Sequence, residues 1–313
     1  MAIPSVDLAD FLSEDVEKKN SFIEKIGEAY ETVGFVAVKN HGISSALIED
    51  LYKYVQEFFS LPLDKKDRYE KTELAGQRGY TSFGKEHAKG SASPDLKEFF
   101  QYGQMPCDNY KEEEYPPNVI VGELPSFNRT FADAYRAFEK SGTLILQAIA
   151  IYLKLDENYF DDFIFNGNSI LRAIHYPPIT TEPKSAIRAE QHEDINLITL
   201  LVGASADGLQ ILTRQNEWVP VTSLPDQIVV NVGDMLQRLT NNKLRSTTHR
   251  VVNPARELWH TSRFSIPFFL HPKSAMSLKC LDICIDDEHQ KIYLDVTAGE
   301  YLDQRLREIG LKK

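Results

Sequence analysis

Two histidines in the second half of the chain stand beside acidic or polar residues at the start of apolar segments. His192 and Asp194 precede the apolar run 195–202, and His249 precedes a pair of valines. Alternate residues of a β-strand point to the same face, so His192 and Asp194 can share a face while Glu193 points away from it. A third ligand from a neighbouring strand, for which His249 is the natural candidate, would complete one triangular face of a metal ion.

Two imidazoles and one carboxylate on one face leave three coordination positions of a metal open. Non-haem Fe(II) oxygenases use this arrangement, whereas zinc usually completes a tetrahedron of ligands. A His-x-Asp triplet by itself is also expected for a surface histidine in a polar turn. The apolar residues after Asp194 and after His249 favour the metal site, because they place these side chains at the rim of a buried sheet, where an unpaired polar group costs several kcal/mol.

The segments that must position these residues fall into two groups, and the first group is mainly helical. Apolar residues recur every three or four positions between Ser13 and Gly34, which predicts a helix with a serine N-cap and a glycine at its end. The same criteria predict a strand over 35–38, a helix that begins after Ser44 and a long helix over 126–153.

From about residue 168 the pattern changes to short β-rich runs separated by turn residues. Seven strands are predicted there: 169–175, 196–202, 208–212, 218–221, 227–232, 247–252 and 263–270. No long helix separates them, so they favour an antiparallel core with helices packed on it. The expected fold class is therefore mainly β with packed helices (α+β), with a double-stranded β-helix (jelly-roll) core and a helical N-terminal region.

This change of pattern predicts two domains. Residues 1–125 would form a mostly helical N-terminal domain, and residues 126–313 would hold the scaffold helix, the jelly-roll domain and a C-terminal helix over 298–311. The segment 77–103 carries several glycines and mixed charges, which predicts a long loop that can serve as a lid.

The composition predicts a globular chain and excludes several classes of partner. With 35 Lys and Arg against 46 Asp and Glu, the formal charge is −11, which disfavours nucleic acid and anionic membranes. Cys107, Cys280 and Cys284 are an odd number without metal-type spacing, so we expect no disulfide framework, no thiolate zinc site, and a cytoplasmic location. We expect neither a signal peptide nor an apolar run near the roughly 18–20 residues that span a bilayer. The oligomeric state is not predicted.

Several motifs occur together in an order and spacing that a known enzyme family shares. They are His192-x-Asp194 with His249, Gly208-Leu209-Gln210, Val230-Asn231-Val232-Gly233-Asp234, the segment 246–251, and Arg263-x-Ser265-x-Pro267. The N-terminal third adds Ile3-Pro4, Gly34-Phe35, Asn40-His41-Gly42, Gly79-Tyr80 and Lys97-Glu98. With these motifs the chain resembles, over nearly its whole length, the isopenicillin N synthase-like branch of the Fe(II)/2-oxoglutarate-dependent dioxygenases.

The resemblance implies that His192, Asp194 and His249 hold the iron and that Arg263 with Ser265 binds the distal carboxylate of 2-oxoglutarate. A guanidinium is permanently charged and planar, and a serine two residues along a strand faces the same way, which suits a carboxylate. A surface arginine in an ion pair is the alternative for Arg263.

Tyr176 matches the family's tyrosine that helps to hold the cosubstrate. The two prolines that follow it stop the strand and leave the tyrosine at the strand's end. Ile174 stands where plant members of the family usually carry asparagine, so one polar contact of the family is missing here. A core tyrosine whose hydroxyl is satisfied elsewhere is the alternative.

The activity that the resemblance implies is oxygenation of a small organic substrate with Fe(II), 2-oxoglutarate and O2, and ascorbate as a candidate reductant. The substrate would be hydroxylated, desaturated or cyclised, with release of succinate and CO2. Two alternatives stay open: a 2-oxoglutarate-independent oxidase of the isopenicillin N synthase or aminocyclopropane carboxylate oxidase kind, and a non-catalytic jelly-roll binding module. The sequence does not predict which substrate is bound.

Overall fold

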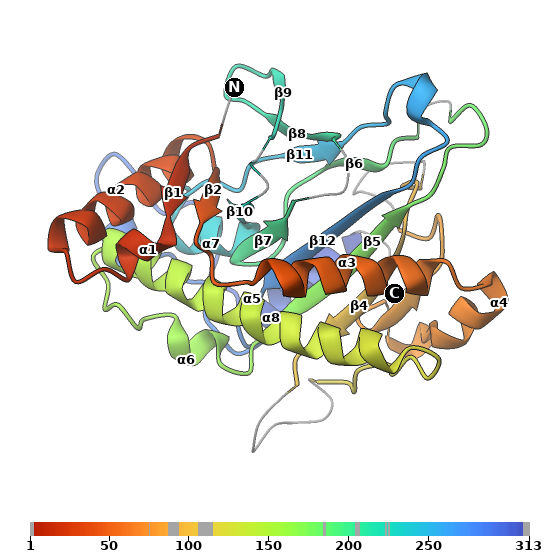
Figure 1. Cartoon of the computed structure of the whole chain (residues 1–313). Helices are drawn as coiled ribbons and strands as arrows, with labels where there is room; N and C mark the ends of the chain where they lie inside the picture. The colour runs from red at the N-terminus through yellow and green to blue at the C-terminus, as the bar shows by residue number, and fades with distance from the viewer. Residues whose placement is uncertain are drawn as a thin grey trace.

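Two β-sheets form the centre of the molecule, and the longer helices lie on the outer side of the larger sheet (Figure 1). The structure is a computed structural model that describes residues 3–74, 76–86, 94–105, 115–183, 186–203, 207–222, 224 and 226–308. Cys107 lies outside these residues, while Cys280 and Cys284 are buried free thiols.

The larger sheet has eight strands in the order β1-β2-β10-β7-β12-β5-β4-β3, and the smaller sheet has four in the order β6-β11-β8-β9. Only β1 and β2 pair in parallel among these neighbours. The strands are β1 Ser5–Asp7, β2 Phe35–Lys39, β3 Gly79–Thr81, β4 Glu98–Gly103, β5 Ile170–Tyr176, β6 Ala189–His192, β7 Ile198–Val202, β8 Leu209–Leu212, β9 Trp218–Pro220, β10 Gln227–Val232, β11 His249–Val251 and β12 Arg263–Leu270.

Helix α5 packs against β5, β7 and β12 of the larger sheet, and α2 and α3 pack against α5. The helices are α1 Leu8–Phe11, α2 Val16–Thr32, α3 Ser45–Phe59, α4 Leu63–Lys66, α5 Pro125–Tyr152, α6 Asp161–Ile164, α7 Asp234–Leu239 and α8 Ala298–Glu308, with 3-10 turns at Asp67–Tyr69, Thr72–Leu74, Arg256–Leu258 and Asp282–Cys284. Among the described helices, none combines the length and the apolar character that a bilayer crossing requires.

Two small apolar clusters join the sheets face to face. One holds Phe35 and Val229 of the larger sheet with Ile211 of the smaller sheet. The other holds Tyr176 of the larger sheet with Val251 of the smaller sheet. Since the side chains of each strand alternate between its two faces, the opposite face of the larger sheet is left to the helices, which bury the main core there.

The predicted β core with packed helices is confirmed, and each of the seven predicted strands is present with small shifts of its ends. The helix over 126–153 is α5, and Ser44 caps α3 through its side chain, as predicted. The N-cap of α2 is Asp15 rather than Ser13, because the Asp15 carboxylate accepts from two free N–H groups of the first turn.

The segment 77–103 is not the single long loop that the sequence predicts. Its ends form β3 and β4, which pair with each other, and β4 continues the sheet by pairing with β5. Phe99 and Phe100 point to opposite faces of β4 and are both buried, which supplies the apolar contact that a loop would lack. Residues 87–93 between the two strands, and residues 309–311 of the predicted C-terminal helix, lie outside the described part of the chain.

The residues before position 126 supply four strands of the larger sheet. They are β1 and β2 at one edge and β3 and β4 at the other edge (Figure 1). Strands of the N-terminal segment thus belong to the same sheet as β5, β7, β10 and β12. The division into residues 1–125 and 126–313 stays a prediction.

Gly34 brings the N-terminal segment close to the chain that leads into β11. Its φ of +77° lies in the left-handed region, which favours glycine. A Cβ at this position would lie 2.4 Å from Oγ1 of Thr247 and 2.5 Å from the carbonyl oxygen of Arg245. The absence of a side chain therefore allows this close approach two residues before His249.

Candidate active site

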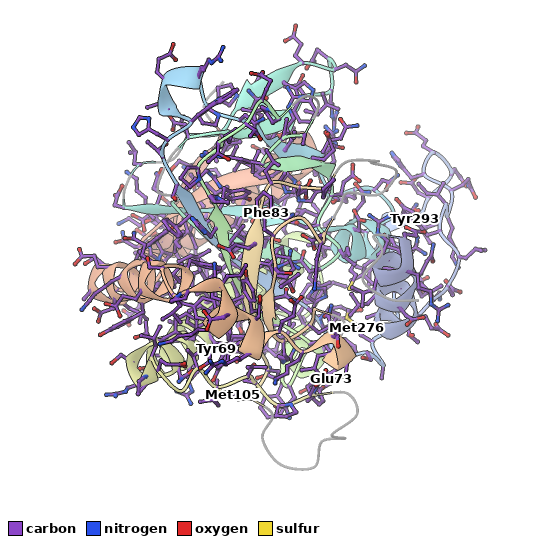
Figure 2. The ribbon with its side chains drawn as sticks, turned by 90° about the vertical axis from the view of Figure 1, so that its right-hand side faces the viewer. Tyr69, Glu73, Phe83, Met105, Met276 and Tyr293 are labelled. Carbon is purple, nitrogen blue, oxygen red and sulfur yellow. The ribbon has the colours of Figure 1, made fainter. Side chains whose placement is uncertain are left out.

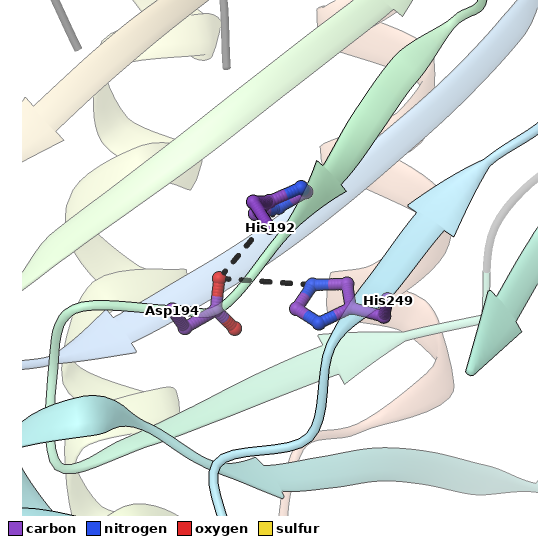
Figure 3. A group of neighbouring side chains, drawn as sticks. All are labelled: His192, Asp194 and His249. Atoms are coloured by element: carbon purple, nitrogen blue, oxygen red, sulfur yellow. Dashed lines mark ion pairs between the residues drawn. The ribbon is translucent and has the colours of Figure 1, made fainter. Parts of the chain in front are cut away.

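Three side chains from two strands and the loop between β6 and β7 converge at the end of the smaller sheet. β6 ends at His192 and β11 begins at His249, and the two residues are paired across the antiparallel strands. Oδ1 of Asp194 lies 4.0 Å from Nε2 of His192 and 3.8 Å from Nε2 of His249 (Figure 3). One donor atom from each residue lies within 4.8 Å of the others, so the group can hold a single metal ion.

The Asp194 carboxylate is held in place through its other oxygen. Oδ2 accepts hydrogen bonds from Oγ1 of Thr199 at 2.7 Å and from Nδ2 of Asn231 at 2.8 Å. Burial alone raises the pKa of Asp194, but the two histidines and these two hydrogen bonds outweigh burial, so the pKa lies below its usual value. The carboxylate is therefore ionised at neutral pH, with Oδ1 directed at the histidines.

Both imidazoles are oriented by backbone carbonyl groups. Nδ1 of His192 lies 2.7 Å from the carbonyl oxygen of Glu190, and Nδ1 of His249 lies 3.1 Å from that of Thr247. A carbonyl oxygen only accepts, so each Nδ1 carries the proton and each Nε2 presents a lone pair towards Asp194. Burial and the neighbouring His249 lower the pKa of His192 to about 4, which keeps this imidazole neutral at pH 7.

The chemistry of the donor set fits an Fe(II) ion. Two imidazole nitrogens and one ionised carboxylate oxygen surround one point, and no further His, Cys, Asp or Glu of the described residues joins the group. Three protein donors leave positions for exchangeable ligands, which is the facial arrangement of non-haem Fe(II) oxygenases rather than a closed structural zinc site.

A cavity of about 490 Å³ borders this group. His192 and Asp194 lie on its wall, together with Gln101 of β4 and Arg172 of β5. Its volume is in the range of small-molecule sites, which measure roughly 300–1,000 Å³. The cavity therefore offers space for a small molecule beside the candidate metal position.

Helix α8 closes one side of the cavity with Leu302, Arg305 and Leu306. The helix is tied to the β core through Asp234, whose Oδ2 accepts from the hydroxyl of Tyr301 at 3.0 Å. The guanidinium of Arg238 lies over the ring of Tyr301 and over the ring of Tyr293, 4.8 and 4.6 Å away, which links α8 to the segment before it. Figure 2 labels Tyr293 of that segment, close to α8.

The predicted cosubstrate residues lie together on two neighbouring strands. Arg263 of β12 and Tyr176 of β5 are paired across the strands, and the guanidinium lies 5.0 Å above the tyrosine ring. Ser265 follows two residues later on β12 and is buried, as are Arg263 and Tyr176. These three residues are not among those that border the 490 Å³ cavity.

Known proteins that resemble this chain in both of its halves belong to one enzyme family. Residues 3–123 match the family model for the non-haem dioxygenase N-terminal region, and residues 167–272 match that for the 2OG-Fe(II) oxygenase superfamily. Proline hydroxylase buaE of Petromyces alliaceus is 34% identical over 322 residues, which cover 98% of this chain and 99% of the relative. The chain belongs to the Fe(II)/2-oxoglutarate-dependent oxygenase family.

Solved structures confirm the jelly-roll fold of this oxygenase. A 2OG-Fe(II) oxygenase family protein of Caulobacter crescentus has a TM-score of 0.88 at 38% identity and covers 98% of this chain and 99% of its own. A Neurospora crassa protein in complex with alpha-KG (2-oxoglutarate) and thymine has a TM-score of 0.87 at 31% identity, covering 97% and 96%. Fe(II) and 2-oxoglutarate are therefore the cofactors of the oxygenase, as predicted. These relatives favour a 2-oxoglutarate-dependent enzyme over an independent oxidase or a non-catalytic binding module.

The structure of the oxygenase places one further cation beside the cosubstrate residues, which the sequence analysis missed. Arg188 is 1% exposed, and its guanidinium lies 5.9 Å above the ring of Tyr176. Nη2 donates to the carbonyl oxygen of Thr261 at 3.1 Å, while Nε has no partner in the described part of the chain. Burial and the charge of Arg263 lower the pKa of Arg188 to about 10. In the sequence, the only feature that distinguishes Arg188 is its position four residues before His192.

The structure also pairs His175 of β5 with Glu98 of β4. Nδ1 of His175 lies 2.7 Å from Oε1 of Glu98, and Nζ of Lys66 lies 2.8 Å from Oε2. These residues are far apart in sequence, so their spacing carries no signal. The cluster joins α4, β4 and β5 and supports the strand that ends at Tyr176.

Proposed function

We propose that His192, Asp194 and His249 hold the Fe(II) of this oxygenase and that it oxidises a C–H bond of a small organic molecule in the adjoining cavity. The observation that carries the proposal is the convergence of three metal-ligand atoms beside that cavity, which His192 and Asp194 border. When bound, Fe(II) and 2-oxoglutarate supply the oxidising chemistry, with O2 consumed and succinate and CO2 released. Hydroxylation is the default outcome, and desaturation or ring formation can use the same site.

Tyr176, Arg263 and Ser265 would bind the distal carboxylate of 2-oxoglutarate. The fork of Arg263 suits a carboxylate, and the hydroxyl of Ser265 lies on the same face of β12. Arg188 adds a second buried positive charge above the same tyrosine. Two buried cations beside each other repel, so an entering carboxylate would relieve that repulsion as well as accept hydrogen bonds.

The residues of the chain then have distinct tasks around the cofactors. Thr199 and Asn231 hold Asp194 in position by occupying Oδ2, which leaves Oδ1 for the metal. Glu190 and Thr247 fix the tautomers of the two histidines through their carbonyl groups. Helix α8 covers the side of the cavity and limits access of water to the bound substrate.

A small substrate is supported by the cavity volume and by the relatives. One relative is named a proline hydroxylase, and the Neurospora crassa protein has been solved in complex with thymine. The formal charge of −11 disfavours nucleic acid as a substrate. The free thiols of Cys280 and Cys284 suit a cytoplasmic location, and ascorbate is a suitable reductant for the iron.

Titration of the metal-free protein with Fe(II) and 2-oxoglutarate in the absence of O2 tests the proposal. We expect a visible charge-transfer band, and we expect succinate release once air is admitted. Asp194→Ala should abolish the band, because the metal would lose its only anionic protein ligand. A band of unchanged intensity in Asp194→Ala would show that the metal is held elsewhere, and absence of succinate in the wild-type protein would contradict the proposed reaction.

A further inference from the structure

The wall of the cavity beside the triad carries a network of four charged side chains. Nη1 of Arg172 lies 3.2 and 3.3 Å from the two oxygens of Glu86, and Nζ of Lys97 lies 2.7 Å from Oε2 of Glu86 and 2.8 Å from Oδ2 of Asp95. All four residues border the cavity. The two cations and two anions balance, so the network as a whole is neutral.

The orientation of Arg172 is fixed from three sides. Its Nε donates to Oε1 of Gln101 at 2.8 Å, and its guanidinium lies 4.2 Å above the ring of Phe99 and 5.3 Å above that of Phe269. Stacking on aromatic rings defines the plane of the guanidinium, and the two hydrogen bonds define its rotation in that plane. Arg172 is thus a pre-oriented donor rather than a mobile surface cation.

One donor nitrogen of Arg172 remains for a ligand. Nε is used by Gln101 and Nη1 by Glu86, whereas Nη2 makes no hydrogen bond to any residue that the structure describes. A carboxylate binds arginine best through two parallel N–H groups, and here it would have to share a nitrogen with Gln101 or Glu86. A single carbonyl oxygen needs only the one donor that is left.

Glu86 offers an acceptor next to that donor. The charges of Arg172 and Lys97 outweigh burial and lower the pKa of Glu86 to about 2, so its carboxylate is ionised. Each carboxylate oxygen can accept more than one hydrogen bond, and Oε1 receives only Nη1 of Arg172 among the described residues. The wall therefore presents a donor and an acceptor side by side.

We propose that the substrate is a small uncharged ring with a cis amide, as in a lactam or a cyclic imide, whose carbonyl accepts from Nη2 of Arg172 and whose N–H donates to Glu86. A ring holds C=O and N–H on the same edge, which matches this adjacent donor and acceptor, whereas an open trans amide presents them on opposite sides. A net charge on the ligand would upset the balance of the network at a cost that a neutral ring avoids. This inference rests on the proposed function, because it assigns the cavity to the substrate.

Binding of a matched series of six-membered rings tests the proposal. The probes are 2-piperidone, N-methyl-2-piperidone, which lacks the N–H, and pipecolate, which carries an ammonium and a carboxylate instead of the amide. They are titrated by calorimetry and by the change in the visible band into the Fe(II)·2-oxoglutarate protein without O2. We expect 2-piperidone to bind at least about tenfold more tightly than either of the other two rings.

Arg172→Met keeps a long side chain between the two phenylalanine rings and removes the donor. This substitution should weaken the binding of 2-piperidone about 10- to 100-fold and leave the affinity for 2-oxoglutarate unchanged. Arg250→Met is the matched control, because Arg250 also donates through Nε to a glutamine and stacks on an aromatic ring, Trp218, but does not border the cavity. It should bind 2-piperidone as the wild-type protein does.

Three results would overturn the inference: tighter binding of pipecolate than of 2-piperidone, equal binding of the N-methylated ring, or no effect of Arg172→Met. If Arg172→Met does not fold, the relative affinities of the three rings for the wild-type protein still test the proposed substrate class. Failure of the band to form while 2-piperidone binds contradicts the proposed function alone. A normal band without binding of 2-piperidone contradicts only the assignment of the substrate.

Discussion

Thr199→Val isolates the interaction that positions the Asp194 carboxylate. Valine has nearly the shape of threonine but lacks the hydroxyl that donates to Oδ2 of Asp194 at 2.7 Å. A hydrogen bond to a charged group contributes about 1.5–3 kcal/mol. Asn231 keeps its own hydrogen bond to the same oxygen, so we expect a loss at the lower end of this range. About 1.5 kcal/mol corresponds to roughly tenfold weaker binding of Fe(II).

The assay is calorimetric titration of Fe(II) into the metal-free protein without O2, with urea unfolding as a measure of stability. Thr199→Ser restores a hydroxyl and should recover most of the affinity. Thr143→Val is the control, because that hydroxyl donates to the carbonyl oxygen of Glu139 on α5 and does not reach the candidate metal site. Wild-type affinity in a stably folded Thr199→Val protein would refute the argument that this hydrogen bond orients Asp194.

Three further changes test other parts of the structure. Arg188→Met should weaken 2-oxoglutarate binding about tenfold in equilibrium titration, since one buried charge beside Tyr176 is lost; unchanged affinity would assign Arg188 to packing alone. Glu98→Gln should lower the free energy of unfolding in urea by about 3 kcal/mol at neutral pH, because Lys66 loses its buried anionic partner. Gly34→Ala should also destabilise the protein, by about 1 kcal/mol or more, and a stability within error of wild type would show that the backbone shifts freely there.

The pH dependence of stability gives a separate check on Glu98. Burial raises its pKa, but hydrogen bonds from His175, Lys66 and Tyr80 outweigh burial, so the pKa is lowered in the folded protein. A lowered pKa stabilises the fold above the unfolded value of about 4.3, and this stabilisation is lost as the pH falls through the folded pKa. Acidification from about pH 7 to about pH 3 should therefore cost the wild-type protein more stability than Glu98→Gln. Equal losses would contradict the lowered pKa.

The residues that meet in the candidate metal group could be found from the sequence because their geometry is local. His192 and Asp194 lie two positions apart, and a strand places such residues on one face. His249 was a natural third ligand because polar residues also precede an apolar run there. The predicted arrangement agrees with the structure, in which the three donors lie within 4.8 Å of one another.

What the sequence could not predict depends on pairing between distant strands. Arg172 and Glu86 are brought together only when β5 lies beside β4 and its preceding segment, and neither residue belongs to a motif. Arg188 has no local signal beyond its charge. The strands β1, β3 and β6 have three or four residues each, which is too short for a period of two to be recognised.

The position of β12 in the larger sheet has a consequence for synthesis of the chain on the ribosome. Without β12 the sheet order separates into two pieces, β1-β2-β10-β7 and β5-β4-β3. The two pieces can join only after Leu270, the last residue of β12, has left the exit tunnel. Until then β7 and β5 each expose an unpaired edge, which is a template for pairing with other chains. Nascent chains arrested before this residue should therefore depend on chaperones to remain unaggregated.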